Sequence, residues 1–154
     1  MKISPHVSYK EATYSETATR NDIDNEPNAK QLLRIKVLCD NLFEPLRDWV
    51  SGPIKINSCF RSEELNTRIG GASSSQHLAN NGAAMDIDDT YGYRTNAEMF
   101  FYIKDNLEFD QMIWEFGDDD NPDWVHVSYN RGDNRGQILK ACKVDGRTKY
   151  LTWG

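Results

Sequence analysis

The order of helical and strand-like segments is the feature that most limits how this chain can fold. Apolar residues recur at helical spacing from Asn28 to Val50, and Gly52–Pro53 ends that segment. Later segments are short and alternate apolar with polar residues, as half-buried strands do. Because helices come first and neighbouring strands follow, the pattern predicts an α+β fold around a mostly antiparallel sheet.

The other expected elements are shorter. Helices are expected over residues 62–68 and 96–106, and strands over residues 54–60, 83–88, 111–116 and 124–129. A C-terminal β-hairpin is expected over residues 137–153, turning at Asp145–Gly146, and residues 1–27 are expected to be irregular. A chain of 154 residues fits one domain, 1–154, with its own core.

The charge of the chain argues against a nucleic-acid partner. The net charge is −6, although the segment from Arg131 to the end holds six basic and two acidic residues. We interpret this basic tail as a solvated face, with contact to an anionic polymer such as a cell-wall glycan as the alternative.

The sequence contains no segment typical of a membrane span or a signal peptide. No run approaches the roughly 18 apolar residues of a membrane span, and the N-terminus has no apolar signal-peptide region. We therefore expect synthesis in the cytoplasm without a signal peptide. The three cysteines (Cys39, Cys59 and Cys142) lack C-x-x-C spacing, so free thiols are expected.

Two histidines and one aspartate point to a metal. His77 follows three serines and a glutamine in a polar loop, His126 lies mid-strand in WVHVSY, and Asp86 is on the polar face of its strand. Two imidazoles and a carboxylate, with a fourth position left to water, form the ligand set of a catalytic zinc site. His6, the remaining histidine, is expected to be structural.

A zinc hydrolase also needs a proton acceptor beside the bound water. Asp123 lies three residues before His126, and Pro122 predicts that the strand begins only after Asp123, which would let that side chain turn toward the metal. Glu115 is the alternative base, or a partner for a histidine N–H. Spacing alone does not choose between the two acids.

Three blocks of sequence resemble a known family. INSCFRSEELN, SSSQHLANNGAAMDID and IWEFGDDDNPDWVHVSY are similar to blocks of the D-Ala-D-Ala zinc peptidases, which include carboxypeptidases, dipeptidases and phage L-alanyl-D-glutamate endopeptidases. The blocks span Ile56 to Tyr129, about half of the chain. The resemblance implies the hedgehog/D-Ala-D-Ala peptidase fold, with helices on one side of the sheet and zinc on its open face.

The resemblance also implies roles for individual residues. One Zn²⁺ per chain would be held by His77, Asp86 and His126, with Asp123 as the general base. Arg61 would polarise the scissile carbonyl or bind a substrate carboxylate, and Ser75 would contact the substrate.

One spacing departs from the family pattern. The first histidine and the aspartate are usually seven residues apart, whereas His77 and Asp86 are nine apart. The G-x-A-x-D-I block at residues 82–87 is intact, so we expect the extra residues within Ala79–Asn81, as a longer loop. The longer loop makes Asp88, on the same strand face as Asp86, a rival ligand.

The resemblance implies a peptidase that cuts peptidoglycan stem peptides and acts on the bacterial cell wall as a monomer. A phage-type lytic endopeptidase, serving lysis or carried in a virion, is favoured over a D-Ala-D-Ala carboxypeptidase. The alternative is a catalytically inactive, zinc-containing cell-wall-binding or virion structural domain. The presence of Asp123 and Arg61 favours the enzyme, because a structural zinc site needs neither.

Overall fold

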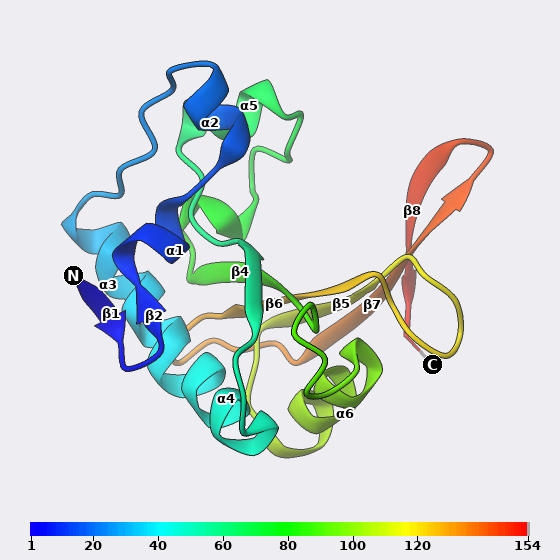
Figure 1. Ribbon diagram of the computed structural model, residues 1–154. Helices are drawn as coiled ribbons and strands as arrows, with labels where there is room; N and C mark the ends of the chain where they lie inside the picture. Colours follow the sequence, from blue (N-terminus) through cyan, green and yellow to red (C-terminus); the bar gives the residue numbers. More distant parts are fainter. Residues whose placement is uncertain (154) are drawn as a thin grey trace.

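The computed structural model describes residues 1–153, which form helices packed against one six-stranded sheet (Figure 1). The helical elements are α1 (Tyr9–Thr13), α2 (Glu16–Arg20), α3 (Ala29–Leu38), η1 (Cys39–Phe43), α4 (Glu44–Val50), α5 (Glu63–Arg68), η2 (Gln76–Leu78) and α6 (Asn96–Asn106). The strands are β1 (Lys2–Ser4), β2 (Val7–Ser8), β3 (Lys55–Ser58), β4 (Ala83–Asp88), β5 (Gln111–Glu115), β6 (Trp124–Tyr129), β7 (Gln137–Val144) and β8 (Arg147–Thr152). The α+β class predicted from the sequence is confirmed.

The main sheet has the strand order β3-β4-β6-β5-β7-β8. All neighbouring strands are antiparallel except β5 and β7, which run parallel. β6 lies between β5 and β7 in the chain and runs antiparallel to β5. The chain then turns again, so β7 runs in the same direction as β5 and pairs with it in parallel. The two short strands β1 and β2 form a separate hairpin at the N-terminus.

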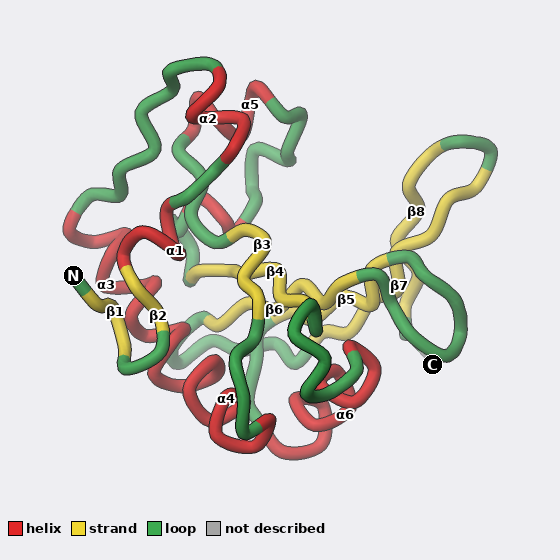
Figure 2. Tube along the Cα trace, viewed as in Figure 1, coloured by secondary structure: helices red, strands yellow, loops and turns green. Residues whose placement is uncertain are grey.

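The two faces of the sheet differ in chemistry because side chains alternate along each strand. On β4, Met85 and Ile87 are fully buried and belong to the main hydrophobic core. Asp86 lies between them and therefore points to the opposite face. The core face is covered by helices, since α3 contacts β4 and β6 and α6 contacts β6. Figure 2 shows α3, α4 and α6 together on one side of the strands.

The long helical segment expected at residues 28–50 is present but contains an irregular turn. Asn28 caps α3 in a capping box with Gln31, and the five-residue π-helical segment η1 then connects α3 to α4. Pro45 follows in the first turn of α4 and cannot donate the N–H that a continuing α-helix would use. The wider turn of η1 lies just before Pro45, so the helical segment continues from α3 into α4 although Pro45 has no N–H to donate.

The N-terminal segment 1–27, expected to be irregular, contains the β1–β2 hairpin and two five-residue helices. Serine supplies the start of each helix, because the hydroxyls of Ser8 and Ser15 accept backbone N–H groups of the first turns of α1 and α2. Asn25 then joins this segment to the sheet end, where its amide donates to the Phe60 carbonyl and its oxygen accepts from the Ser62 N–H.

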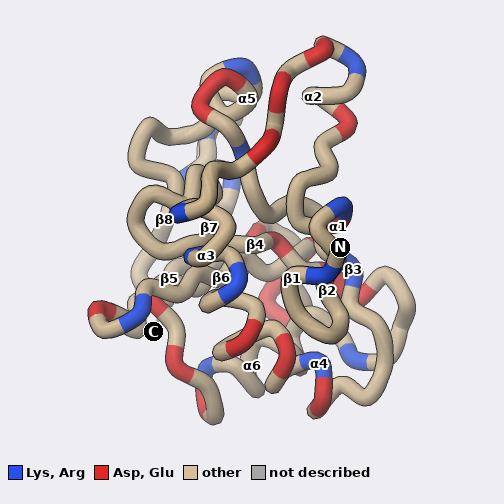
Figure 3. The backbone as a smooth tube through the Cα atoms, turned by 90° about the vertical axis from the view of Figure 1, so that its left-hand side faces the viewer, with Lys and Arg blue, Asp and Glu red and all other residues tan. Residues whose placement is uncertain are grey.

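The basic tail is partly neutralised in the fold. Arg135 pairs with Asp110 and Lys140 pairs with Asp119. Lys and Arg are interleaved with Asp and Glu along the backbone rather than gathered on one side (Figure 3). Within residues 1–153, no helix combines the length and apolarity needed to cross a membrane.

The aromatic cluster under the sheet gives a first prediction. Phe100 is fully buried and its ring lies 5.1 Å from that of Trp114 and 4.9 Å from that of Trp153. Phe100→Ala is expected to lower the free energy of unfolding by about 3–5 kcal/mol, measured by urea denaturation. Phe101→Ala is the matched control, because its ring touches the same cluster but is 42% exposed. Equal losses for the two variants would contradict this assignment of the core.

Candidate metal centre

The fold brings His77, Asp86 and His126 together on the open face of the sheet. Their potential ligand atoms all lie within 4.8 Å of one another. Asp86 on β4 and His126 on β6 are direct cross-strand partners, so their side chains share one face. His77 comes from the short helix η2 in the loop before β4. All three residues are at most 9% exposed.

The hydrogen bonds around His77 leave one ring nitrogen for a metal. Nδ1 lies 2.6 Å from the backbone carbonyl of Cys59, which can only accept, so Nδ1 carries the proton. Nε2 is then the basic nitrogen, and it lies 3.4 Å from Oδ1 of Asp86. A histidine whose other nitrogen donates to a carbonyl is oriented as metal-binding histidines are.

The aspartate links the two histidines. Nδ1 of His126 lies 2.9 Å from the same Oδ1 of Asp86, and the two imidazole rings meet edge to face with centroids 5.1 Å apart. Ligand bonds of about 2.0–2.1 Å in a tetrahedron imply ligand atoms about 3.3 Å apart. The separations of 2.9 and 3.4 Å from Oδ1 of Asp86 are close to this value, and all three ligand atoms lie within 4.8 Å of one another, so the donor types and their spacing suit a small ion such as zinc.

The protonation states also suit a metal. Burial lowers the pKa of His77, against the opposing charge of Asp86, so the imidazole is held neutral. Burial acts to raise the pKa of Asp86, but the two histidines outweigh it and hold that pKa well below its ordinary value. A neutral imidazole and an ionised carboxylate are the forms that bind a cation.

Arg61 places a positive charge beside the cluster. Its Nη2 lies 3.8 Å from Oδ2 of Asp86, and its backbone N–H donates to the carbonyl of His77. Burial lowers the pKa of this guanidinium, while the charges of Asp86 and Glu115 raise it. Arginine remains protonated throughout the range in which proteins fold, so the cation is permanent.

The cluster lies in a cleft of about 820 Å³. Along β6 the lining runs from Trp124 through His126 to Asn130. One wall comes from the loop that carries His77. The other comes partly from the β7–β8 hairpin, which contributes Leu139, Thr148 and Tyr150. The cleft therefore extends along the strand in both directions from the candidate ligands.

Glu115 lines this cleft on the face that carries the cluster. It pairs across the strands with Trp124, two residues before His126, and so lies on the same face of the sheet. The residue is 8% exposed. Burial raises the pKa of Glu115 to about 7, with His126 opposing and Asp86 adding to the rise. A carboxyl group with a pKa near neutrality can both accept and return a proton.

Asp123 lies elsewhere. β6 begins at Trp124, as Pro122 led us to expect, but the side chain of Asp123 is exposed and does not line the cleft. The backbone explains this placement, because the N–H of Asp123 donates to the carbonyl of Glu115 and continues the strand pairing by one residue. The regular alternation of the strand then directs Asp123 away from the face that carries His126.

Two further candidates have defined surroundings. Ser75 lines the cleft, and its hydroxyl accepts the N–H of His77 to cap η2. Asp88 is outside the three-residue cluster, because Asn96 donates to its Oδ1 at 2.8 Å and Thr90 to its Oδ2 at 2.6 Å. The carboxylate of Asp88 therefore bonds residues that follow β4 and is not part of the cluster.

A buried His–Asp–His cluster in an open cleft, with a fixed guanidinium and a near-neutral carboxyl beside it, is the arrangement of a mononuclear metallohydrolase. The family model of Peptidase M15 matches residues 5–128, and the chain belongs to this family of metallopeptidases, which confirms the resemblance seen in the sequence. A search of curated proteins finds no match. The family match ends before β7, so the hairpin wall of the cleft lies outside it.

Exchanging each aspartate tests the ligand set. Zinc at 100 times its Kd is expected to raise the free energy of unfolding of the wild type by about 2.7 kcal/mol. Asp86→Asn should abolish most of this gain, because the charged ligand is removed, while Asp88→Asn should keep it. Unfolding with zinc or with chelator measures both. The reverse result would make Asp88 the ligand.

Glu115 gives the metal-free protein a specific pH dependence. Its pKa in the folded state, about 7, is above its ordinary value of 4.5, so the folded state binds an extra proton between these values. The free energy of unfolding should therefore fall as the pH rises through this window, and the penalty should be complete above it.

Glu115→Gln removes the titrating group. In chelator, this variant should be more stable than the wild type by about 1–3 kcal/mol at pH 8, and the difference should disappear by about pH 4. Urea unfolding at a series of pH values measures it. A difference independent of pH would mean that ionisation of Glu115 is not its cause.

Proposed function

We propose that this protein is a zinc-dependent peptidase that hydrolyses peptide bonds in peptidoglycan stem peptides. The observation that carries the proposal is the His77–Asp86–His126 cluster in the cleft of a chain from the Peptidase M15 family. The donor set, its separations and its protonation states fit zinc. The site of action in this proposal is the bacterial cell wall, with a monomer as the active unit, in phage lysis or as part of a virion.

The shape of the cleft favours an endopeptidase over a D-Ala-D-Ala carboxypeptidase. A carboxypeptidase needs a site closed just beyond the scissile bond, with a cation for the terminal carboxylate. Here the lining continues past His126 in both directions, toward Trp124 and toward Asn130. A stem peptide could therefore extend on either side of the metal, which is what cleavage within a chain requires.

Zinc held by His77, Asp86 and His126 would supply a Lewis acid and a water of lowered pKa. The chain itself orients the scissile bond. The guanidinium of Arg61 is the fixed cation nearest the cluster, and we assign it to the carbonyl oxygen, where negative charge develops. Ser75 faces the same space and is assigned to substrate contact.

We assign proton transfer to Glu115. Its carboxyl lies on the cluster face and is shielded from solvent, and burial raises its pKa in the metal-free protein, so it is the group placed to take a proton from water and give one to the leaving amine. Asp123 remains the alternative base. It would have to leave its exposed position and turn across the strand to reach the same proton.

The second candidate function is an inactive zinc-containing domain that binds the cell wall or builds a virion. An inert site would gain from a fourth protein ligand, whereas the cluster among the described residues has three members. Glu115 and Arg61 would also serve no purpose there. These features favour the enzyme.

Digestion of purified muropeptides, with products identified by mass spectrometry, tests both the reaction and the base. Zinc-loaded wild type should release fragments cut within the stem. Glu115→Gln should lose about 10²–10⁴-fold in kcat while still binding zinc. Asp123→Asn, the matched control, should stay within a few-fold of the wild type, and chelator should stop all cleavage.

Other results reassign the roles. Loss of activity in Asp123→Asn with retention in Glu115→Gln would move the base to Asp123. Release of terminal D-Ala alone would make the protein a carboxypeptidase. No product from any zinc-loaded sample would favour the inactive binding domain.

A further inference from the structure

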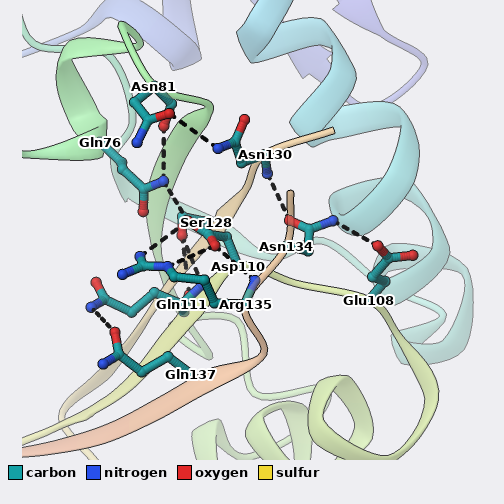
Figure 4. A network of polar contacts seen from close by, with 10 residues as sticks. All are labelled: Gln76, Asn81, Glu108, Asp110, Gln111, Ser128, Asn130, Asn134, Arg135 and Gln137. Carbon is teal, nitrogen blue, oxygen red and sulfur yellow. Dashed lines mark hydrogen bonds and ion pairs between the residues drawn. The ribbon is translucent and has the colours of Figure 1, made fainter. Parts of the chain in front are cut away.

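One wall of the cleft contains a buried carboxylate that the proposed reaction does not use. Asp110 lies directly before β5 and is 1% exposed. Its Oδ1 accepts from the backbone N–H and the Nε of Arg135, both at 2.9 Å, and its Oδ2 accepts from Nη2 of Arg135 at 3.1 Å. A fourth bond comes from Gln76, whose Nε2 lies 2.7 Å from Oδ2 (Figure 4). A buried charge with so many partners is strongly fixed in place.

Gln76 connects this carboxylate to the candidate metal centre. It is the residue before His77, in the three-residue helix η2, and its side chain is almost fully buried. The same Nε2 also donates to the carbonyl of Asn81 at 2.8 Å. One amide group therefore joins the start of η2, the end of the longer loop and the sheet (Figure 4).

The loop around His77 needs such support because it has little regular structure of its own. η2 is a single 3₁₀ turn, and Ala79 after it has a left-handed backbone with φ of 55°. On the helix side, Gln31 donates to the carbonyl of Leu78 and Arg34 to that of Ala79. The Gln76–Asp110 bond holds the opposite side.

We propose that Gln76, Asp110 and Arg135 act as positioning residues for His77, and that they set the affinity of the metal centre. The inference rests on the proposed zinc site. A ligand must be held within about 0.5 Å of its productive place for tight binding, and the Gln76 side chain connects the backbone next to His77 with the start of β5 in the sheet. Arg135 keeps the buried carboxylate charged and oriented.

Zinc affinity measured against a chromophoric chelator tests this role. Gln76→Ala removes the connection but leaves the Asp110–Arg135 pair intact, and it should weaken zinc binding about tenfold or more. Asp110→Asn should do the same, and the double variant should be no weaker than the worse single variant, because the two residues act through one bond. Gln111→Ala is the control: it lies on the same wall, but its side chain bonds Gln137 and not the loop.

Unfolding in chelator separates positioning from general stability. Gln76→Ala should lower the free energy of unfolding in chelator by less than it reduces the favourable free energy of zinc binding. Wild-type affinity in Gln76→Ala would overturn the proposal, and so would a loss of affinity matched by an equal loss of metal-free stability. If Asp110→Asn does not fold, Gln76→Ala alone decides. If the wild type binds no zinc, it is the proposed function that fails.

Discussion

The shared carboxylate of Asp86 is the interaction on which the rest of the site depends. One oxygen faces a nitrogen of each histidine, and the other faces Arg61. This is possible because β4 and β6 pair in a register that sets Asp86 opposite His126. A slip of one residue would turn one of these side chains into the hydrophobic core. Core packing of Met85, Ile87, Val125 and Val127 therefore also fixes the candidate metal centre.

The pKa values of the two acids on the cluster face depend on the charged groups beside them in the cleft. At Asp86, the two histidines outweigh the burial that opposes the ionised form, and Arg61 lies beside the same carboxylate. At Glu115, burial outweighs the charges of His126 and Arg61, and its pKa rises to about 7. Two acids on one face of the sheet thus have pKa values shifted in opposite directions because their neighbours differ, and this difference suits the separate roles of ligand and proton carrier that we propose for them.

Much of this arrangement could be predicted from the sequence, because it depends on local periodicity. Alternation along residues 83–88 and 124–129 predicted the two strands and the faces on which Asp86 and His126 lie. The structure contains both strands, and it places the two side chains on the same face. The location of Asp123 was predicted wrongly, because Pro122 suggested that the alternation would not reach it, whereas a backbone hydrogen bond to Glu115 continues the pairing by one residue. The Gln76–Asp110–Arg135 network was also beyond reach, because it joins three loops distant in the chain.

The contact that orients His77 has a consequence for variation at position 59. The acceptor for Nδ1 is the backbone carbonyl of Cys59, not its thiol. The tautomer of the histidine is therefore independent of which side chain occupies that position, provided that it fills the same buried space. Homologous chains could exchange this cysteine for another small apolar residue without changing the orientation of His77. A contact of this kind leaves no trace in a residue-by-residue comparison, although the site needs it as much as it needs a ligand.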